Sequence, residues 1–239
     1  MPDLRLLLRI GVIAATSRST RVFYDRVSAF YELVFTDHLQ HARTMAATMS
    51  QEFPRSVGTK ILDVACGTGV LSRRLEGQGF SVMGLDFSLQ SLRRLKQTTG
   101  AIPLVQADAA GLPFGSACFD VVTCLGAWRH FPEPQRVLHE ICRVLRPDGV
   151  FLVGYFPPKL GGLFTIPRNW LGKAIVTLYE RAIRLLKYND RIDGEMEQST
   201  LAMLKLAFAR VRRVDSGIDR YLILAGSPHS QVPSARPYA

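Results

Sequence analysis

The strongest constraint on the fold is a regular alternation of short apolar segments with helical segments between residues 60 and 155. The helical segments run to roughly ten residues, and their apolar positions repeat at helical spacing, so the pattern predicts strands separated by helices. Such alternation is typical of a parallel sheet with helices on both faces. The predicted strands are Lys60–Val64, Ser81–Leu85, Pro103–Gln106, Asp120–Leu125 and Val150–Tyr155.

Local signals indicate where several elements begin and end. Ser88 is a good N-cap for a helix that runs to Gln97, and Pro132–Pro134 opens a helix that extends to Arg146. Two short strand-like segments, Val211–Val214 and Tyr221–Leu224, flank a turn with Gly217 and predict an antiparallel hairpin. The expected fold class is therefore α/β, with a mostly parallel seven-stranded sheet whose last strand is antiparallel.

Three segments are expected along the chain. Residues 1–54 form an N-terminal helical cap, in which an aromatic-rich helix over Val22–Met49 ends before Phe53-Pro54. Residues 55–227 form the main domain, with a helical insertion at about 156–208. Residues 228–239 contain three prolines and are expected to be a disordered tail.

Composition and charge exclude few functions. The net charge is +10, and residues 155–239 carry thirteen Lys and Arg against seven Asp and Glu. A basic surface can meet nucleic acid, an anionic membrane or an acidic substrate. No nucleic-acid-binding motif accompanies the charge, so no nucleic-acid partner is expected. The four cysteines lack the spacing of a zinc site, so no metal is expected either.

Two segments bear on contact with a membrane. The run Leu4–Ala15 is apolar but is interrupted by Arg5 and Arg9, and it is too short to span a bilayer. A helix expected over Trp170–Tyr188 has one apolar face and one basic face. Two interpretations of this helix stay open, a lid packed on the domain and a helix that lies on a membrane surface. The expected location is cytoplasmic, with peripheral membrane contact under the second interpretation.

The turn after the first predicted strand carries the first chemical signal. Asp63, Ala65, Gly67 and Gly69 are spaced two apart, and small residues there let the backbone approach a ligand at the N-terminus of the next helix. A dinucleotide fingerprint fits less well, because Asp63 would repel a pyrophosphate. An acid at this place suits a ligand that carries an amino group and a sulfonium charge.

Two further acids follow later strands. Asp86 ends the second strand, where a carboxylate can accept both hydroxyls of a ribose. Asp108, with Ala109 beside it, follows the third strand and can accept a hydrogen bond from an adenine amino group. Since ligands of open α/β sheets bind outside the carboxyl ends of the strands, we expect the three acids at one site. We also expect Asp86 to lie outside the core, so that its replacement leaves the fold intact.

Residues 61–155 resemble the class I S-adenosylmethionine-dependent methyltransferases, in the branch that includes ubiquinone and menaquinone C-methyltransferases. The stretches that carry the resemblance are Ile61–Gly69, Gly84–Ser88, Ala107–Phe114, Phe119–Val122 and Arg143–Phe151. The resemblance implies a Rossmann-like fold and S-adenosyl-L-methionine as the cofactor. It implies the methionine end at Asp63 to Gly69, the ribose at Asp86 and the adenine at Asp108 and Ala109. The expected cofactor-binding residues are Tyr31, Asp63, Ala65, Gly67, Gly69, Asp86, Phe87, Asp108, Ala109 and Leu125.

The loop after the fourth strand bears on the acceptor. Gly126–Phe131 is similar to the Arg-Asn-containing loop of the quinone methyltransferases, with Arg129 matching and His130 in place of the Asn. We name His130 and Arg129 as candidate catalytic residues. His130 would act as a general base if the acceptor has to lose a proton, and the competing interpretation is that it is a packing or surface residue.

The expected activity is methyl transfer to a small, lipophilic, quinone-like acceptor. A phospholipid N-methyltransferase is one alternative, because the aromatic N-terminal helix and the basic surface suit it. A second is an interaction protein that binds S-adenosylmethionine without turnover. An RNA methyltransferase is disfavoured, because the Pro-Pro-type tetrad expected after the fourth strand is absent. The sequence carries no signal for an oligomeric state.

Overall fold

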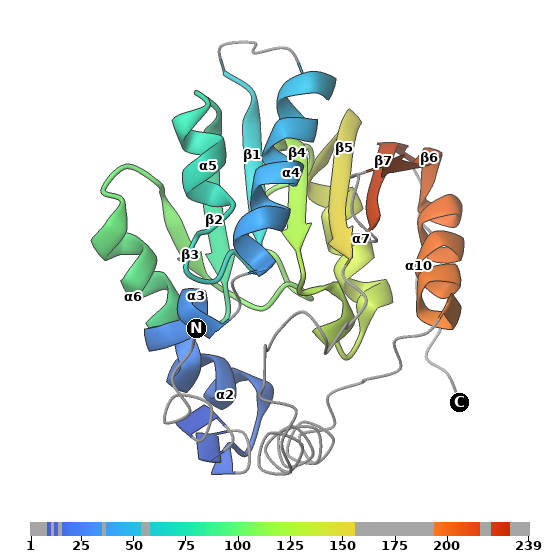
Figure 1. Cartoon of the computed structure of the whole chain (residues 1–239). Helices are drawn as coiled ribbons and strands as arrows, with labels where there is room; N and C mark the ends of the chain where they lie inside the picture. Colours follow the sequence, from blue (N-terminus) through green and yellow to red (C-terminus); the bar gives the residue numbers. More distant parts are fainter. Residues whose placement is uncertain are drawn as a thin grey trace.

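The computed structural model of the chain describes residues 9–10, 12–13, 16–34, 37–53, 58–155, 194–215 and 221–229. Seven strands in these ranges form one mixed sheet in the order β3-β2-β1-β4-β5-β7-β6 (Figure 1). The strands are β1 (Lys60–Val64), β2 (Ser81–Asp86), β3 (Leu104–Gln106), β4 (Phe119–Leu125), β5 (Leu145–Tyr155), β6 (Phe208–Asp215) and β7 (Tyr221–Pro228).

The pairing of the strands confirms the predicted sheet. Each neighbouring pair from β3 to β5 is parallel. Strand β7 runs antiparallel to both β5 and β6, so the predicted C-terminal hairpin is present. The chain reverses its direction of travel across the sheet at β1, which has β2 on one side and β4 on the other. In open α/β sheets the crevice beside such a reversal is where ligands bind.

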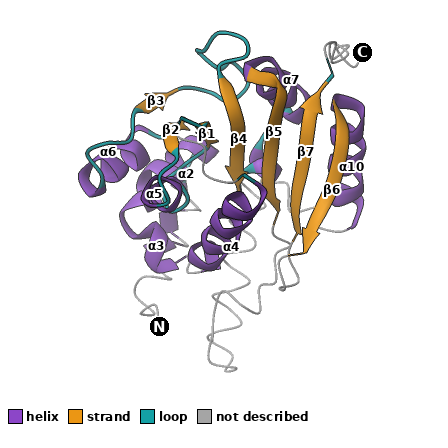
Figure 2. Ribbon diagram, turned by 90° about the horizontal axis from the view of Figure 1, so that it is seen from above, coloured by secondary structure: helices purple, strands orange, loops and turns teal. Residues whose placement is uncertain are grey.

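Helices cover both faces of the sheet. Figure 2 shows α4 and α5 on one side, and α7 and α10 on the other. The helical elements are α2 (Thr20–Val27), η1 (Ser28–Phe30), α3 (Tyr31–Val34), α4 (Asp37–Glu52), α5 (Ser72–Gly77), α6 (Leu89–Thr98), η2 (Trp128–His130), α7 (Pro134–Val144) and α10 (Gly194–Ala207).

Two apolar layers hold the helices to the sheet. Successive side chains of a strand point to opposite faces, so Ile61 and Val121 pack in the layer with α4 and α5. Leu62 and Val122 pack in the opposite layer with α7 and α10. All four side chains are fully buried. Strands that are apolar on both faces are expected of a parallel sheet covered on both sides.

The single helix predicted over Val22–Met49 is wrong, because the structure divides this stretch into α2, η1, α3 and α4. The hydroxyl of Ser28 donates to the carbonyl oxygen of Asp25 at 2.8 Å. Such a local bond competes with regular helical pairing and accompanies the tighter 3₁₀ turn at this point.

Two boundaries toward the C-terminus also differ from prediction. Helix α7 ends at Val144 rather than Arg146, and β5 begins at Leu145, because Pro147 disfavours helix before it. Strand β7 extends through Pro228, which the sequence placed in the tail. The backbone N–H of His229 then donates to the Ala207 carbonyl oxygen at 2.8 Å.

Several predictions concern residues outside the described ranges. These are most of Leu4–Ala15, the helix over Trp170–Tyr188, and the tail from residue 230 onward. Within the described ranges, no helix combines the length and apolar character needed to cross a bilayer.

Candidate active site

The small residues of the turn after β1 face two different environments. Ala65, Gly67 and Gly69 all have positive φ, at 56°, 56° and 80°. A Cβ added at Gly69 would lie 2.1 Å from a methyl carbon of Leu95, a buried residue of α6, whereas one added at Gly67 would meet nothing within 4 Å. Gly69 is therefore demanded by helix packing, and Gly67 leaves open space above the turn.

Asp63 lies buried beneath this turn. Its Oδ1 accepts a hydrogen bond from the Thr123 hydroxyl at 2.8 Å, and its Oδ2 accepts one from the Ser72 hydroxyl. Burial raises the pKa of Asp63 to about 6, although both hydroxyl donors act in the opposite direction. The carboxyl group thus joins β1 to β4 and α5 directly below the site.

Asp86 is only 4% exposed, so the expectation that it lies outside the core is wrong. Its Oδ2 accepts from the backbone N–H of Gly67, and its Oδ1 from the backbone N–H of Ser88, both at 2.8 Å. Burial raises the pKa of Asp86 to about 6. The side chain braces the turn after β1 against the turn after β2, and its remaining lone pairs can still accept from a ligand.

Asp108 and Ala109 lie in the loop after β3. Asp108 is exposed, and its Oδ1 accepts from the backbone N–H of Ala110 at 2.9 Å, while Ala109 is buried. Arg143 of α7 donates to the Leu112 carbonyl oxygen at 2.9 Å and so holds this loop to the helix. The loop therefore keeps its place although it belongs to no strand or helix.

These residues surround a cavity of about 200 Å³ at the carboxyl ends of the strands, with α2 and α3 above it. A smaller cavity of about 40 Å³ shares Tyr31, Ala65, Gly67, Thr68 and Leu125 with the first. Eight of the ten predicted cofactor-binding residues line the larger cavity, and Asp63 lines the smaller one. The exception is Gly69, which packs against α6.

Tyr24 was not among the residues predicted from the sequence, yet it lines the larger cavity and lies among its aromatic side chains. Its ring centroid is 6.1 Å from that of His130, 6.2 Å from Phe87 and 6.3 Å from Tyr31. The available signal was its spacing, since Tyr24 precedes Tyr31 by seven residues, or about two helical turns. We call Tyr24 and Tyr31 the roof tyrosines.

The two candidate catalytic residues differ in position. His130 lines the cavity, whereas Arg129 does not, and the Nε of Arg129 donates to Nε2 of His130 at 3.1 Å. Burial and the adjacent Arg129 guanidinium hold the pKa of His130 well below its usual value, so the ring is neutral. Because Nε2 accepts this bond, we assign the ring proton to Nδ1. Nε2 can take a proton from an acceptor only if Arg129 turns away.

The loop that carries these two residues is fixed from the other side of the sheet. Trp128 is buried, and its indole N–H donates to the hydroxyl of Thr200 in α10 at 3.2 Å. Its ring also lies 5.8 Å from Phe131 in an edge-to-face arrangement. The wall of the cavity next to His130 is therefore rigidly supported.

The cavity suits a nucleoside with a cationic tail. Asp86 and Asp108 can accept hydrogen bonds from hydroxyl and amino groups, and the open space at Gly67 lets a ligand lie directly on the backbone. Aromatic rings above can cover a flat base or attract a cation. These features fit S-adenosylmethionine without any additional group.

Comparisons with known proteins agree with this geometry. The methyltransferase domain family matches residues 62–153. A demethylmenaquinone methyltransferase of Clavibacter sepedonicus is 34% identical over 220 residues, which cover 87% of each protein. One of Renibacterium salmoninarum is 36% identical over 126 residues, and the match spans 53% of its length and 52% of this chain.

The solved structures agree on the fold. A crystal structure of a putative S-adenosyl-L-methionine-dependent methyltransferase from Methanococcus maripaludis superposes with a TM-score of 0.63 at 17% identity, covering 91% of this chain and 97% of the other. A protein from Pyrococcus horikoshii superposes with a TM-score of 0.56 at 23% identity. At these identities the likeness concerns the fold alone.

Proposed function

This chain belongs to the S-adenosylmethionine-dependent methyltransferases, and on that premise we propose that its acceptor is a small lipophilic quinol. The observation that carries the proposal is the apolar and aromatic part of the cavity lining, which includes Tyr24, Phe131 and Pro132. A flat aromatic ring can stack on such a lining. Relatives named demethylmenaquinone methyltransferase support the same class of acceptor.

We propose the following places for the cofactor, which supplies a methyl group on a sulfonium centre. Asp86 accepts from the ribose hydroxyls, while Asp108 and Ala109 meet the adenine. The backbone from Ala65 to Gly67 lies along the methionine end. The contribution of the protein is then alignment of the two reactants and exclusion of water, which can supply much of the acceleration of an in-line displacement.

His130 is the proposed proton acceptor on the side of the acceptor substrate. A carbon of a quinol becomes strongly nucleophilic when the ring hydroxyl loses its proton, and a neutral imidazole can take that proton. Arg129 is proposed to orient the ring through its bond to Nε2 before the acceptor binds, and it has to turn away before Nε2 takes the proton. Peripheral contact with a membrane, where such acceptors reside, stays a prediction from the sequence of residues 170–188.

The test is methyl transfer from radiolabelled S-adenosylmethionine by the full chain. The acceptors are a chemically reduced, prenylated demethylnaphthoquinone, phosphatidylethanolamine vesicles, and a blank without acceptor. We expect label in the quinol alone. Label in the phospholipid would replace this proposal with the phospholipid N-methyltransferase alternative, and binding of the cofactor without transfer to either acceptor would count against a quinol.

A further inference from the structure

Each roof tyrosine is followed directly by an acidic residue. The pairs are Tyr24-Asp25 in α2 and Tyr31-Glu32 in α3. Both tyrosines line the cavity, whereas both acids reach the turns that follow β1 and β2. The same local order, a ring toward the cavity and a carboxylate toward the domain, therefore occurs twice within nine residues.

Asp25 is bound to the turn after β2. Its Oδ1 accepts from the Ser88 hydroxyl at 2.6 Å and from the backbone N–H of Gln90 at 3.4 Å. The backbone N–H of Ser88 donates in turn to Asp86 at 2.8 Å. A single residue thus separates Asp25 from the carboxylate assigned to the ribose.

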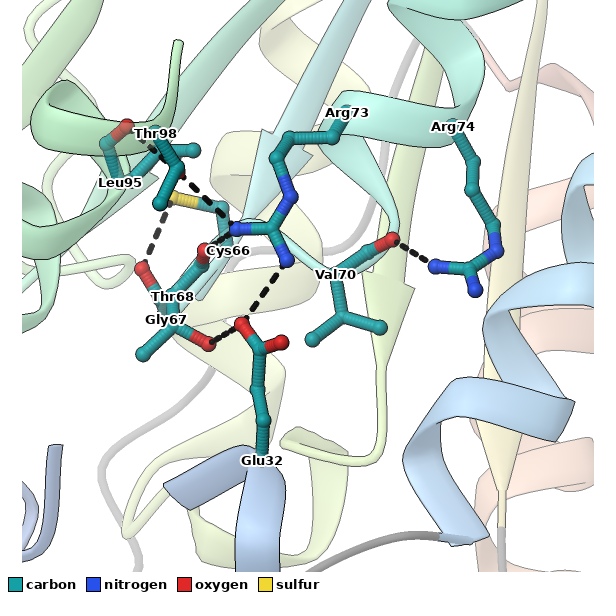
Figure 3. Close-up of polar contacts among 9 residues, drawn as sticks. All are labelled: Glu32, Cys66, Gly67, Thr68, Val70, Arg73, Arg74, Leu95 and Thr98. Atoms are coloured by element: carbon teal, nitrogen blue, oxygen red, sulfur yellow. Dashed lines mark hydrogen bonds and ion pairs between the residues drawn. The ribbon is translucent and has the colours of Figure 1, made fainter. Parts of the chain in front are cut away.

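Glu32 is bound to the turn after β1. Its Oε1 accepts from the Thr68 hydroxyl at 3.0 Å and from Nη2 of Arg73 at 2.8 Å. Figure 3 shows Glu32 extending from α3 to meet both groups. Arg73 is itself held, because its Nη1 donates to the Thr68 carbonyl oxygen at 2.6 Å and to the Thr98 hydroxyl at 3.1 Å. Glu32 therefore meets a donor pair that is already in place.

Ring contacts as well as polar ones join these short helices to the rest of the domain, because Tyr24 meets Phe87 and His130, and Tyr31 meets His38. The apolar cluster of α2 and α3 is formed, among the described residues, by side chains between Ile10 and Tyr31, apart from the two layers on the sheet. Helices of eight and four residues are not stable alone, so their place depends on what holds them. Besides the bonds of the two acids, a hydrogen bond from Nε of Arg94 to the Ser28 hydroxyl oxygen, at 3.2 Å, ties η1 to α6.

We propose that Asp25 and Glu32 are positioning residues that hold the roof tyrosines over the cofactor cavity. The inference rests on the proposed cofactor site. The anchors act before the chemical step, by keeping the roof in the conformation that binds. Their loss lowers the affinity for the cofactor and raises its KM, and leaves kcat at saturation nearly unchanged.

The first experiment measures binding of S-adenosylmethionine and its demethylated product by calorimetry in Asp25→Ala and Glu32→Ala. We expect Kd to rise about five- to tenfold in each, as befits loss of a charge-assisted contact. Glu52→Ala is the matched control, because Glu52 of α4 pairs with Arg212 of β6, away from the cavity. The control should bind as the wild type does. Glu32→Gln should recover part of the affinity, since its amide oxygen still accepts from Thr68.

The second experiment asks whether Glu32 acts through Tyr31. In a Tyr31→Ala background, Glu32→Ala should cost less than twofold in Kd. If the two losses multiply in full, Glu32 does not act through the roof and the inference is overturned. Unchanged affinity in folded Asp25→Ala and Glu32→Ala overturns it as well. A wild-type protein that binds no cofactor would instead contradict the proposed function.

Discussion

At the scale of single residues, the site depends on carboxyl groups that are buried and must still serve a polar ligand. Burial raises the pKa of both Asp63 and Asp86 to about 6. Hydrogen-bond donors keep each carboxylate in a fixed orientation, two hydroxyl groups for Asp63 and two backbone N–H groups for Asp86. Both carboxyl groups therefore change charge just below neutral pH, and the affinity for a ligand that they bind should change with them.

Cofactor affinity should consequently depend on pH. Ribose hydroxyls and an ammonium group favour the ionised carboxylates, so binding lowers the pKa of Asp63 and Asp86 and releases protons near pH 6. Affinity should be full above pH 7 and decrease as pH falls through 6, by up to about tenfold per pH unit for each group. Calorimetry in two buffers of different ionisation enthalpy measures the released protons. A cofactor affinity that stays constant from pH 5 to 8 would contradict this prediction.

Asp86→Ala should weaken both binding and the fold. The substitution removes the acceptor from the backbone N–H groups of Gly67 and Ser88, and each unsatisfied buried donor costs about 1–3 kcal/mol. We expect Kd to rise at least about tenfold and the melting temperature to fall by at least about 4 °C. Asp108→Ala is the control, because this exposed residue bonds only locally to Ala110 among the described residues. It should lose affinity with little change in melting temperature.

At the scale of elements, the period of the sequence was sufficient to predict the strands and the main helices between them, but not the N-terminal helices. Strands buried on both faces stand out as apolar runs, and the N-cap Ser88 and the helix-opening Pro134 mark helix starts directly. The break between α2 and α3 was not predictable from periodicity, because it accompanies one hydroxyl-to-carbonyl bond of Ser28. A pattern of side-chain polarity does not show where a side-chain hydroxyl competes with the backbone for a helical carbonyl oxygen.

The two glycines of the turn after β1 should respond differently to alanine, because they face different elements. Gly69→Ala places a Cβ into Leu95 of α6 at a φ of 80°, so it should lower the melting temperature and disturb the packing of α6. Gly67→Ala meets no atom within 4 Å and should cost only about 1–2 kcal/mol of backbone strain. Its methyl group occupies space above the turn, so cofactor affinity should fall. Thermal melts and calorimetry distinguish the two, and equal effects on both readouts would contradict this assignment.

At the scale of the whole molecule, the cavity combines residues from Thr20 to Pro132. The acidic side was predictable because the carboxyl ends of parallel strands must meet at one edge of the sheet, whatever the packing. Of the roof tyrosines, Tyr31 was expected from the family resemblance, whereas Tyr24 was not, since it reaches the site only through contacts of α2 with the domain. Gly69 lies outside both cavities, and its spacing gives no sign of this, because spacing cannot distinguish a glycine that faces a ligand from one that faces a helix.

Saturation with cofactor should stabilise the entire domain. A ligand at 100 times its Kd adds about 2.7 kcal/mol to the free energy of unfolding. For a domain of this size the melting temperature should rise by about 5–10 °C. Scanning calorimetry with S-adenosylmethionine measures the shift, and NAD at equal concentration is the control. A larger shift with NAD would argue against the methyltransferase assignment.

The place of β7 between β5 and β6 has a consequence for biosynthesis. A ribosome releases β6 before β7, yet β6 pairs only with β7 among the described strands. Until β7 emerges, β5 therefore presents an unpaired edge, and an exposed edge of this kind invites pairing with another chain. A nascent chain that is released before Tyr221 carries all the described residues that line the cavity, but it lacks the strand that pairs with β5. Such premature products are candidates for chaperone capture or for aggregation, although their cofactor-binding sequence is intact.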